Sequence, residues 1–141
     1  MEATVAKPYI HAISSARRHG GEPNDYADLH DFMDSSKAAI PDNRHRALTH
    51  NSWFIGVVIE RVFGRTRINS AGKEYSTRQI AEEHCLEDFA NRFIPSASDY
   101  LMEMEFKTWM DNGRKTCPPS HQKIADAQTL TLRETIKFDR D

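Results

Sequence analysis

The sequence predicts a mainly α protein: a compact bundle of about five helices, with one small β-hairpin inserted between helices three and four. Apolar residues recur at helical spacing in five segments, residues that start and end helices flank those segments, and one turn-rich stretch changes the period. The 141 residues suffice for one hydrophobic core. We expect a helical, His-rich domain over residues 7–112 and a polar C-terminal arm over residues 113–141.

The first two helices are predicted at residues 7–18 and 23–39. Gly20 or Gly21 ends the first helix, and Pro41 follows the second. The apolar positions at helical spacing are Tyr9, Ile10 and Ile13 in the first segment, and Tyr26, Leu29, Phe32 and Met33 in the second. Each segment therefore offers one apolar face to the core.

The third helix is predicted over residues 42–63 and is expected to be the most buried. Asp42 is a favourable N-cap, and Gly64 ends the helix. Its broad apolar face consists of Ala47, His50, Phe54, Val57, Val58, Ile59 and Val62.

A hairpin and two more helices complete the predicted domain. The period changes over residues 68–75, where the turn-forming sequence NSAG favours a hairpin. Ser76 and Gln79 match a capping box, which predicts a helix over residues 76–92. A fifth helix is predicted after the sequence IPS, beginning at Ser96 or Ser98 and ending near residue 112.

The composition argues against several classes of function. The net charge is −2 and the pI is about 6.4, so the whole chain has no positive field that attracts nucleic acid. No apolar run approaches the roughly 18 residues of a membrane span, and the N-terminus lacks the features of a signal peptide, so we expect a cytoplasmic protein. The two cysteines fit neither a disulfide framework nor a Cys-x-x-Cys zinc site. Any metal must therefore be held by histidine and carboxylate side chains.

Two His-x-x-x-Asp pairs are the clearest chemical signal in the sequence. His30 stands four residues before Asp34, and His84 stands four residues before Asp88, which puts both members of a pair on one helix face. His50 lies within the apolar face of the predicted third helix, so three helices can aim imidazoles at one interior point. Imidazole and carboxylate together suit zinc, iron or manganese.

His11 and His45 extend this cluster. His11 lies near the apolar face of the first helix, whereas His45 lies at the start of the third and is rotated by roughly 140° from His50, so that it either folds over the site or faces solvent. The predicted metal ligands are His11, His30, Asp34, His45, His50, His84 and Asp88. Either aspartate can bind a metal directly or orient a histidine. A buried hydrogen-bond network without metal is the alternative for the whole cluster.

Four further charged residues are candidates for catalytic roles. Glu83 is suited to be the general base for a metal-bound water if burial raises its pKa. Arg44, Arg46 and Lys37 can neutralise an anionic substrate. Structural roles are the alternative: a solvated helix face for Glu83, pairing with nearby acids for the arginines, and the dipole at a helix C-terminus for Lys37.

Several motifs occur in order along the chain: HAISSARRHGG, DYADLHDFMDSSK, DNRHRALTHNSW, ERVFG, INSAGK, RQIAEEHCLEDF and IPSASDYL. This series resembles an uncharacterised family of small His-rich bacterial and phage proteins, whose motifs include the types RHRALxHN and EEHCLEDF. The resemblance covers roughly residues 9–105. It implies that the histidines and aspartates named above belong to family motifs, and it implies no established activity.

These residues lead to two hypotheses of function. The first is a divalent-metal-binding helical protein, with hydrolysis of a phosphoester as its candidate activity; whether the protein is an enzyme stays open. The second is a non-enzymatic protein-interaction module, whose His/Asp cluster is a structural metal site or a buried polar network. The expected partner is a phosphorylated small molecule in the first case and a protein bound through the C-terminal arm in the second. Nucleic acid and membranes are not expected partners.

Overall fold

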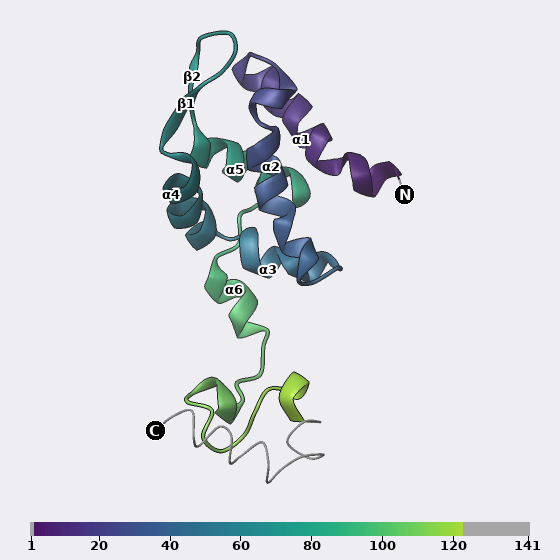
Figure 1. Cartoon of the computed structure of the whole chain (residues 1–141), viewed down its shortest axis with the longest axis vertical. Coiled ribbons are helices and arrows are strands. Elements are labelled where there is room, and N and C mark those ends of the chain that lie inside the picture. The colour runs from purple at the N-terminus through teal and green to yellow at the C-terminus, as the bar shows by residue number, and fades with distance from the viewer. Residues whose placement is uncertain (1, 123–141) are drawn as a thin grey trace. The chain divides into compact units, whose positions relative to one another are not determined.

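Figure 1 shows the protein as a computed structural model, which describes residues 2–122. The chain divides into two units, residues 1–103 and residues 104–141. The predicted polar arm at residues 113–141 lies outside the described residues from residue 123 onward. The fold and the site described below belong to the first unit.

The first unit is mainly helical and contains one two-stranded antiparallel hairpin, which confirms the predicted fold class. Its α-helices are α1 (Glu2–His19), α2 (Ala27–Asp34), α3 (Arg46–Thr49), α4 (Glu60–Phe63), α5 (Thr77–Asp88) and α6 (Ala97–Met102). The hairpin strands are β1 (Thr66–Ile68) and β2 (Glu74–Ser76). A π-helix spans Phe54–Ile59, and short 3-10 helices occur at Pro23–Asp25, Ser35–Ala38 and Asn43–His45, and in the second unit at Thr108–Met110.

The core lies where α1, α2 and α5 pack against one another, and the π-helix also packs against α5 (Figure 1). Its buried side chains are Ala12, Tyr26, Leu29, Met33, Ile55, Ile59, Tyr75, Ile80, Ala81 and Cys85. The Tyr26 hydroxyl donates to the Gly20 carbonyl oxygen at 2.7 Å. A side chain of the core therefore stabilises the turn between α1 and α2. Among residues 2–122, no helix has both the length and the apolar character needed to cross a bilayer.

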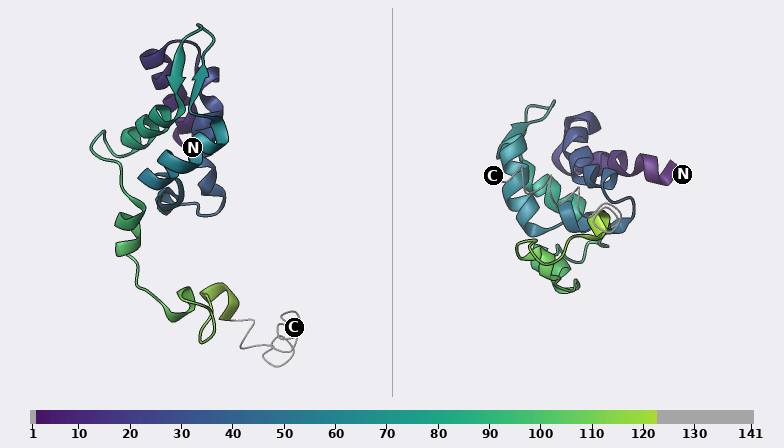
Figure 2. Two further views of the ribbon diagram at one scale, coloured as in Figure 1. Left: turned by 90° about the vertical axis from the view of Figure 1, so that its left-hand side faces the viewer. Right: turned by 60° about the horizontal axis from the view of Figure 1, so that its bottom comes forward.

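The hairpin confirms the turn predicted at residues 68–75, and it stands at one end of the helices (Figure 2). Its register places Arg67 opposite Tyr75. The Arg67 guanidinium donates to the Asp28 carboxylate at 2.7 Å and to the Tyr75 hydroxyl at 2.8 Å. The Asn69 amide donates to the His19 carbonyl oxygen at 3.1 Å. These bonds attach the hairpin to α1 and α2.

The continuous helix predicted over residues 42–63 is wrong, because the chain leaves the helix at His50. This residue has φ −99° and ψ 58°, outside the helical region. The Asn51 side chain serves both helix ends: its amide donates to the Ala47 carbonyl oxygen, and its oxygen accepts from the Phe54 amide. Asparagine is a favourable N-cap residue, so Asn51 stabilises the break without glycine or proline.

The last two predicted helices are shorter than the sequence pattern indicated. The helix predicted over residues 76–92 ends at Asp88. Left-handed backbone follows at Ala90 (φ 58°) and Asn91 (φ 59°). The helix predicted over residues 96–112 ends at Met102. The apolar side chains beyond Met102 are largely exposed, so burial does not favour further helical turns there.

Candidate metal centre

Four side chains converge in the interior of the first unit: Asp34, His50, His84 and Asp88. One ligand atom of each lies within 4.8 Å of the other three. His50 Nε2 lies 2.9 Å from Asp88 Oδ2 and 3.7 Å from Asp34 Oδ1. His84 Nε2 lies 3.3 Å from each of those two oxygens. Both imidazoles are fully buried and both carboxylates nearly so. Two imidazoles and two carboxylates at this spacing can hold a metal ion.

The secondary structure explains why these four side chains meet. Asp34 is the last residue of α2, and α2 packs against α5. His84 and Asp88 lie one turn apart on α5 and share a face. His50 lies in the break after α3. The break that interrupts the predicted continuous helix therefore supplies one of the four candidate metal ligands, which are called the four donors below.

The proton on His50 is placed by a backbone carbonyl. The Thr49 hydroxyl lies 2.7 Å from the Met33 carbonyl oxygen, which can only accept, so the hydroxyl gives its single hydrogen there. His50 Nδ1 lies 2.9 Å from the same hydroxyl oxygen and must then donate to it. His50 therefore presents the lone pair of Nε2 to the carboxylates of Asp34 and Asp88.

His45 is buried behind His50 and does not face solvent. The two rings meet edge to face, with centroids 5.4 Å apart. Because the Thr49 hydrogen is already used, the Ser36 hydroxyl, 3.0 Å away, donates to Thr49 and accepts from His45 Nδ1 at 2.7 Å. The pKa of His45 is lowered to about 4, mainly because burial disfavours the charged imidazole. A neutral His45 thus ends a hydrogen-bond chain that begins at His50.

His30 and Ser15 form a second chain behind His84. His84 Nδ1 lies 2.8 Å from His30 Nδ1, and His30 Nε2 lies 2.7 Å from Ser15 Oγ. All three side chains are buried. Burial, followed by the neighbouring His84 and His11, lowers the pKa of His30 to about 2. His30 is therefore neutral, and it contacts the candidate metal ligand His84 without being one of the four candidate ligands itself.

His11 lies between two carboxylates. Its Nδ1 lies 2.6 Å from Glu87 Oε1, and its Nε2 lies 3.3 Å from Asp88 Oδ1. Burial by itself lowers the pKa of His11, but hydrogen bonds with Asp88 and Glu87 outweigh it and raise the pKa to about 9. The Ser14 hydroxyl also donates to Glu87. His11 is therefore a cation at neutral pH that pairs with Asp88 from outside the four donors.

Arg46 and Lys37 bring further positive charge to the two aspartates. Arg46 Nη2 lies 3.8 Å from Asp88 Oδ1, and its guanidinium lies over the Phe89 ring. Lys37 Nζ lies 3.7 Å from Asp34 Oδ2. Burial raises the pKa of each aspartate, but hydrogen bonds outweigh it, first with His84 for Asp34 and first with His11 for Asp88, and both pKa values fall below the ordinary value. Both carboxylates are therefore ionised, which is the form that binds metal.

The other two proposed catalytic residues are engaged elsewhere. Glu83 Oε1 bonds to His19 Nε2 at 2.8 Å. Arg44 pairs with Asp42 at 2.7 Å and is 85% exposed. The structure thus brings Arg46 and Lys37 to the His/Asp cluster, whereas Glu83 and Arg44 have partners outside it.

The sequence pattern did not single out five residues that complete the cluster: Ser14, Ser15, Ser36, Thr49 and Glu87. Ser14 and Ser15 follow His11 by three and four residues, so they share its helix face, and this spacing was an available signal. Glu87 likewise follows His84 by three residues. The contacts of Ser36 and Thr49 depend on the helix break and had no such signal.

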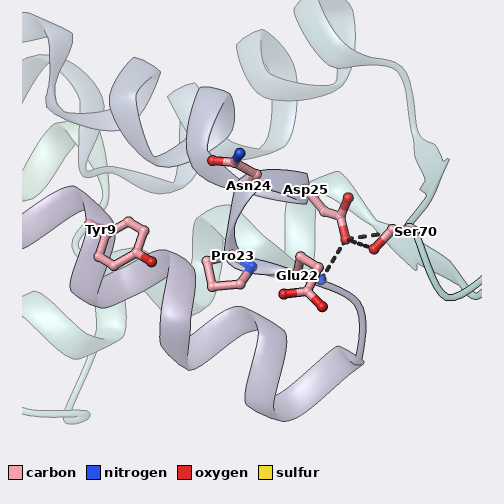
Figure 3. Close-up of a pocket in the computed structure, with 6 residues that line it drawn as sticks. All are labelled: Tyr9, Glu22, Pro23, Asn24, Asp25 and Ser70. Carbon is pink, nitrogen blue, oxygen red and sulfur yellow. Dashed lines mark hydrogen bonds between the residues drawn. The ribbon is translucent and has the colours of Figure 1, made fainter.

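An open pocket lies elsewhere on the first unit (Figure 3). Its lining comes from α1, the turn before α2 and the tip of the hairpin: Tyr9, Glu22, Pro23, Asn24, Asp25 and Ser70. One Asp25 carboxylate oxygen accepts from the backbone amides of Glu22 and Ser70 and from the Ser70 hydroxyl. These bonds fasten the hairpin tip to the turn, so this pocket is formed by structural contacts and includes none of the four donors.

A protein-family profile matches residues 6–110, and its description is a domain of unknown function (DUF6915). The matched residues include the whole His/Asp cluster. The chain has no match among the curated proteins or among the solved structures.

Proposed function

Because the chain belongs to the DUF6915 family, whose description names no activity, we propose a function from the geometry of the cluster: the protein binds one divalent metal ion through Asp34, His50, His84 and Asp88. The ion links α2, α5 and the break after α3. All four donors come from the protein, and the imidazoles are fully buried. Closed sites of this kind stabilise a fold, whereas catalytic sites keep a position open for water.

One observation carries the proposal: the lone pair of His50 Nε2 points at carboxylate oxygens. The Met33 carbonyl and the Thr49 hydroxyl hold the proton of His50 on Nδ1, so Nε2 and Asp88 Oδ2 meet at 2.9 Å as two acceptors. A second proton would make His50 a buried cation. The pKa of His50 is lowered, mainly because burial disfavours that charged form. A metal ion among these acceptors satisfies all of them at once.

The surrounding side chains also support a metal ion. A histidine that binds metal usually donates its other ring nitrogen to a fixed partner, and Thr49 is that partner for His50. Nitrogen and oxygen donors without thiolate suit zinc, manganese and iron. Both aspartates are ionised, so the donor set carries the negative charge that a divalent cation requires.

Metal uptake tests the proposal directly. Protein purified without a His tag and stripped with a chelator is titrated calorimetrically with Zn²⁺, Mn²⁺ and, without oxygen, Fe²⁺. We expect uptake of about one equivalent of at least one ion, with a rise in Tm. Asp88→Asn and His50→Gln should abolish tight uptake, whereas His19→Gln, at a histidine that bonds to Glu83, should retain it. Absence of uptake by the wild-type protein would overturn the proposal.

Hydrolysis of a phosphoester is a second candidate function, and one observation favours it. Among the four side chains of the site, Asp34 has the largest exposed fraction, 8%, and Lys37 Nζ lies 3.7 Å from its second oxygen. The Lys37 side chain is 30% exposed, so a cation stands at the solvent edge of the site. In this proposal Lys37 and Arg46 attract the substrate anion, and the metal polarises it when bound.

A generic phosphoester tests this second function. Metal-loaded protein is assayed with p-nitrophenyl phosphate and bis(p-nitrophenyl) phosphate. Activity that Lys37→Ala reduces without changing metal content would support hydrolysis. Activity that Lys37→Ala and the exposed-site control Arg44→Ala reduce equally would count against a role for Lys37, and metal-loaded protein without activity would leave the ion with a structural role.

A further inference from the structure

We infer that His30 is a positioning residue for metal binding: together with Ser15, it allows His84 to carry its proton on Nδ1 and to offer Nε2 to the ion. The inference rests on the metal site proposed above. It adds how one of the four donors becomes available, and which residues outside the four control that step.

Both ring nitrogens of His84 have partners. Nε2 faces Asp34 and Asp88, at 3.3 Å from an oxygen of each. Nδ1 faces His30 Nδ1 at 2.8 Å. A neutral imidazole has one protonated nitrogen and one lone pair. To bind metal through Nε2, His84 must carry its proton on Nδ1, and His30 Nδ1 must accept it.

If His30 Nδ1 accepts from His84, then His30 Nε2 must carry the proton and needs an acceptor. When Nδ1 of a neutral His30 accepts, its single proton lies on Nε2, where Ser15 Oγ is 2.7 Å away. His30 is only 1% exposed and Ser15 only 3%, so water has little access to either group. Ser15 is therefore the acceptor that lets His30 receive a hydrogen bond from His84.

Ser15 differs in this respect from Thr49. The Thr49 hydrogen is committed to the Met33 carbonyl oxygen, so the tautomer of His50 is fixed whether or not metal is present. The Ser15 hydroxyl bonds to an imidazole nitrogen, which either donates or accepts, so it permits both directions of the chain. The tautomer of His50 is thus fixed by the Met33 carbonyl, whereas the tautomer of His84 can change when metal binds.

The two directions of the chain contain the same number of protons. Without metal, His84 Nε2–H donates to an aspartate, His30 Nδ1–H donates to His84 Nδ1, and the Ser15 hydroxyl donates to His30 Nε2. With metal, His84 Nδ1–H donates to His30 Nδ1, and His30 Nε2–H donates to Ser15 Oγ. Each imidazole keeps one proton, and only the nitrogen that carries it changes.

Nitrogen-15 NMR of the imidazole rings tests this exchange in the wild-type protein. Spectra of the metal-free and Zn²⁺-loaded forms show which ring nitrogen of His30 and His84 carries the proton. We expect His30 to change from Nδ1–H to Nε2–H and His84 to change from Nε2–H to Nδ1–H. A Zn²⁺-loaded protein in which His30 keeps Nδ1–H would overturn the inference.

Variants of His30 provide a second test, measured as the Kd for Zn²⁺. His30→Leu cannot accept from His84 Nδ1–H and should weaken binding by about 10- to 100-fold. His30→Gln has an amide oxygen that accepts, and should recover most of that loss. His45→Leu is the matched control: His45 is equally buried, but it lies at the end of the other chain, where Thr49 still holds His50. Its Zn²⁺ affinity should stay close to that of the wild-type protein.

The outcomes separate the two proposals. If the wild-type protein binds no metal, the metal site and this inference both fall. If it binds Zn²⁺ but His30→Leu and His45→Leu weaken binding equally, the metal site stands and the positioning role of His30 falls. Weak binding by His30→Gln, equal to that of His30→Leu in a protein that still folds, would also contradict the role.

Discussion

Replacing Thr49 with valine is the sharpest single perturbation of the site, because it removes one hydroxyl and almost no volume. Thr49 Oγ1 donates to the Met33 carbonyl oxygen and accepts from His50 Nδ1 and the Ser36 hydroxyl. In Thr49→Val the carbonyl, the imidazole N–H and the Ser36 hydroxyl all lose this buried partner. The tautomer of His50 is then no longer fixed.

The contacts of Thr49 set the expected size of the effect. An unpaired buried polar group costs about 1–3 kcal/mol, and three groups lose a partner here, so the metal-free protein should lose about 3–9 kcal/mol of unfolding free energy. A metal ligand that loses its orienting partner typically costs about 10- to 100-fold in metal affinity. We therefore expect Thr49→Val to bind Zn²⁺ about 10- to 100-fold more weakly than the wild-type protein.

Urea unfolding without metal and calorimetric titration with Zn²⁺ measure the two effects separately. The control is Thr77→Val: this buried hydroxyl donates to the Gly64 carbonyl oxygen and contacts none of the four donors. Thr77→Val should reduce stability but not the Zn²⁺ affinity of the folded protein, and Thr49→Ser should preserve both. Equal Zn²⁺ affinities for Thr49→Val and Thr77→Val would refute the argument that the backbone fixes His50.

Three further measurements test other features of the fold. The pKa of His11 is about 9 in the folded protein and 6.5 ordinarily, so protonated His11 contributes up to about 3 kcal/mol to the free energy of unfolding; this contribution is complete below pH 6.5 and is lost as the pH rises to 9. In urea unfolding of the metal-free protein, the wild type should therefore lose stability more steeply over this pH range than His11→Gln. Parallel plots of stability against pH for the two proteins would contradict this. Gly21→Ala should cost about 1–3 kcal/mol more than Gly72→Ala in thermal or urea unfolding. Both glycines have positive φ (74° and 80°), but a Cβ at residue 21 would clash with the Asp25 carboxylate and the Asn69 side chain, whereas nothing lies within 4 Å at residue 72. Equal losses would mean that both of these side chains move aside freely. Burial raises the pKa of the Cys85 thiol to about 12, so iodoacetamide should modify the less buried Cys117 first, and equal rates in the folded protein would show that the core opens readily.

Much of the fold follows from the apolar pattern, because helical periodicity reports which face of a helix is buried. This pattern predicted the helices that became α1, α2 and α5, and the turn sequence NSAG predicted the hairpin. The same reasoning placed His50 in the interior, where it is fully buried. The four-residue spacing between His84 and Asp88 correctly put them on one face of α5.

The break at Asn51 could not be predicted in the same way. The apolar residues on both sides of it keep a helical period, and one asparagine is compatible with a helix as well as with a cap. Its capping role depends on where the chain goes next, which is decided by packing against α5 and α6. The directions of the hydrogen bonds at Thr49 and Ser15 depend on that packing too, so composition and spacing contain no record of them.

The contacts within the His/Asp cluster join parts of the chain that are far apart in sequence. The contact between His50 and Asp88 spans 38 residues, and that between Asp34 and His84 spans 50. Because closing such long loops costs entropy, we expect these contacts to form late in folding. An ion bound there must be released before the loops can open. Loading with metal should therefore lower the rate of unfolding far more than it raises the rate of folding, and a chelator should shorten the lifetime of the native state.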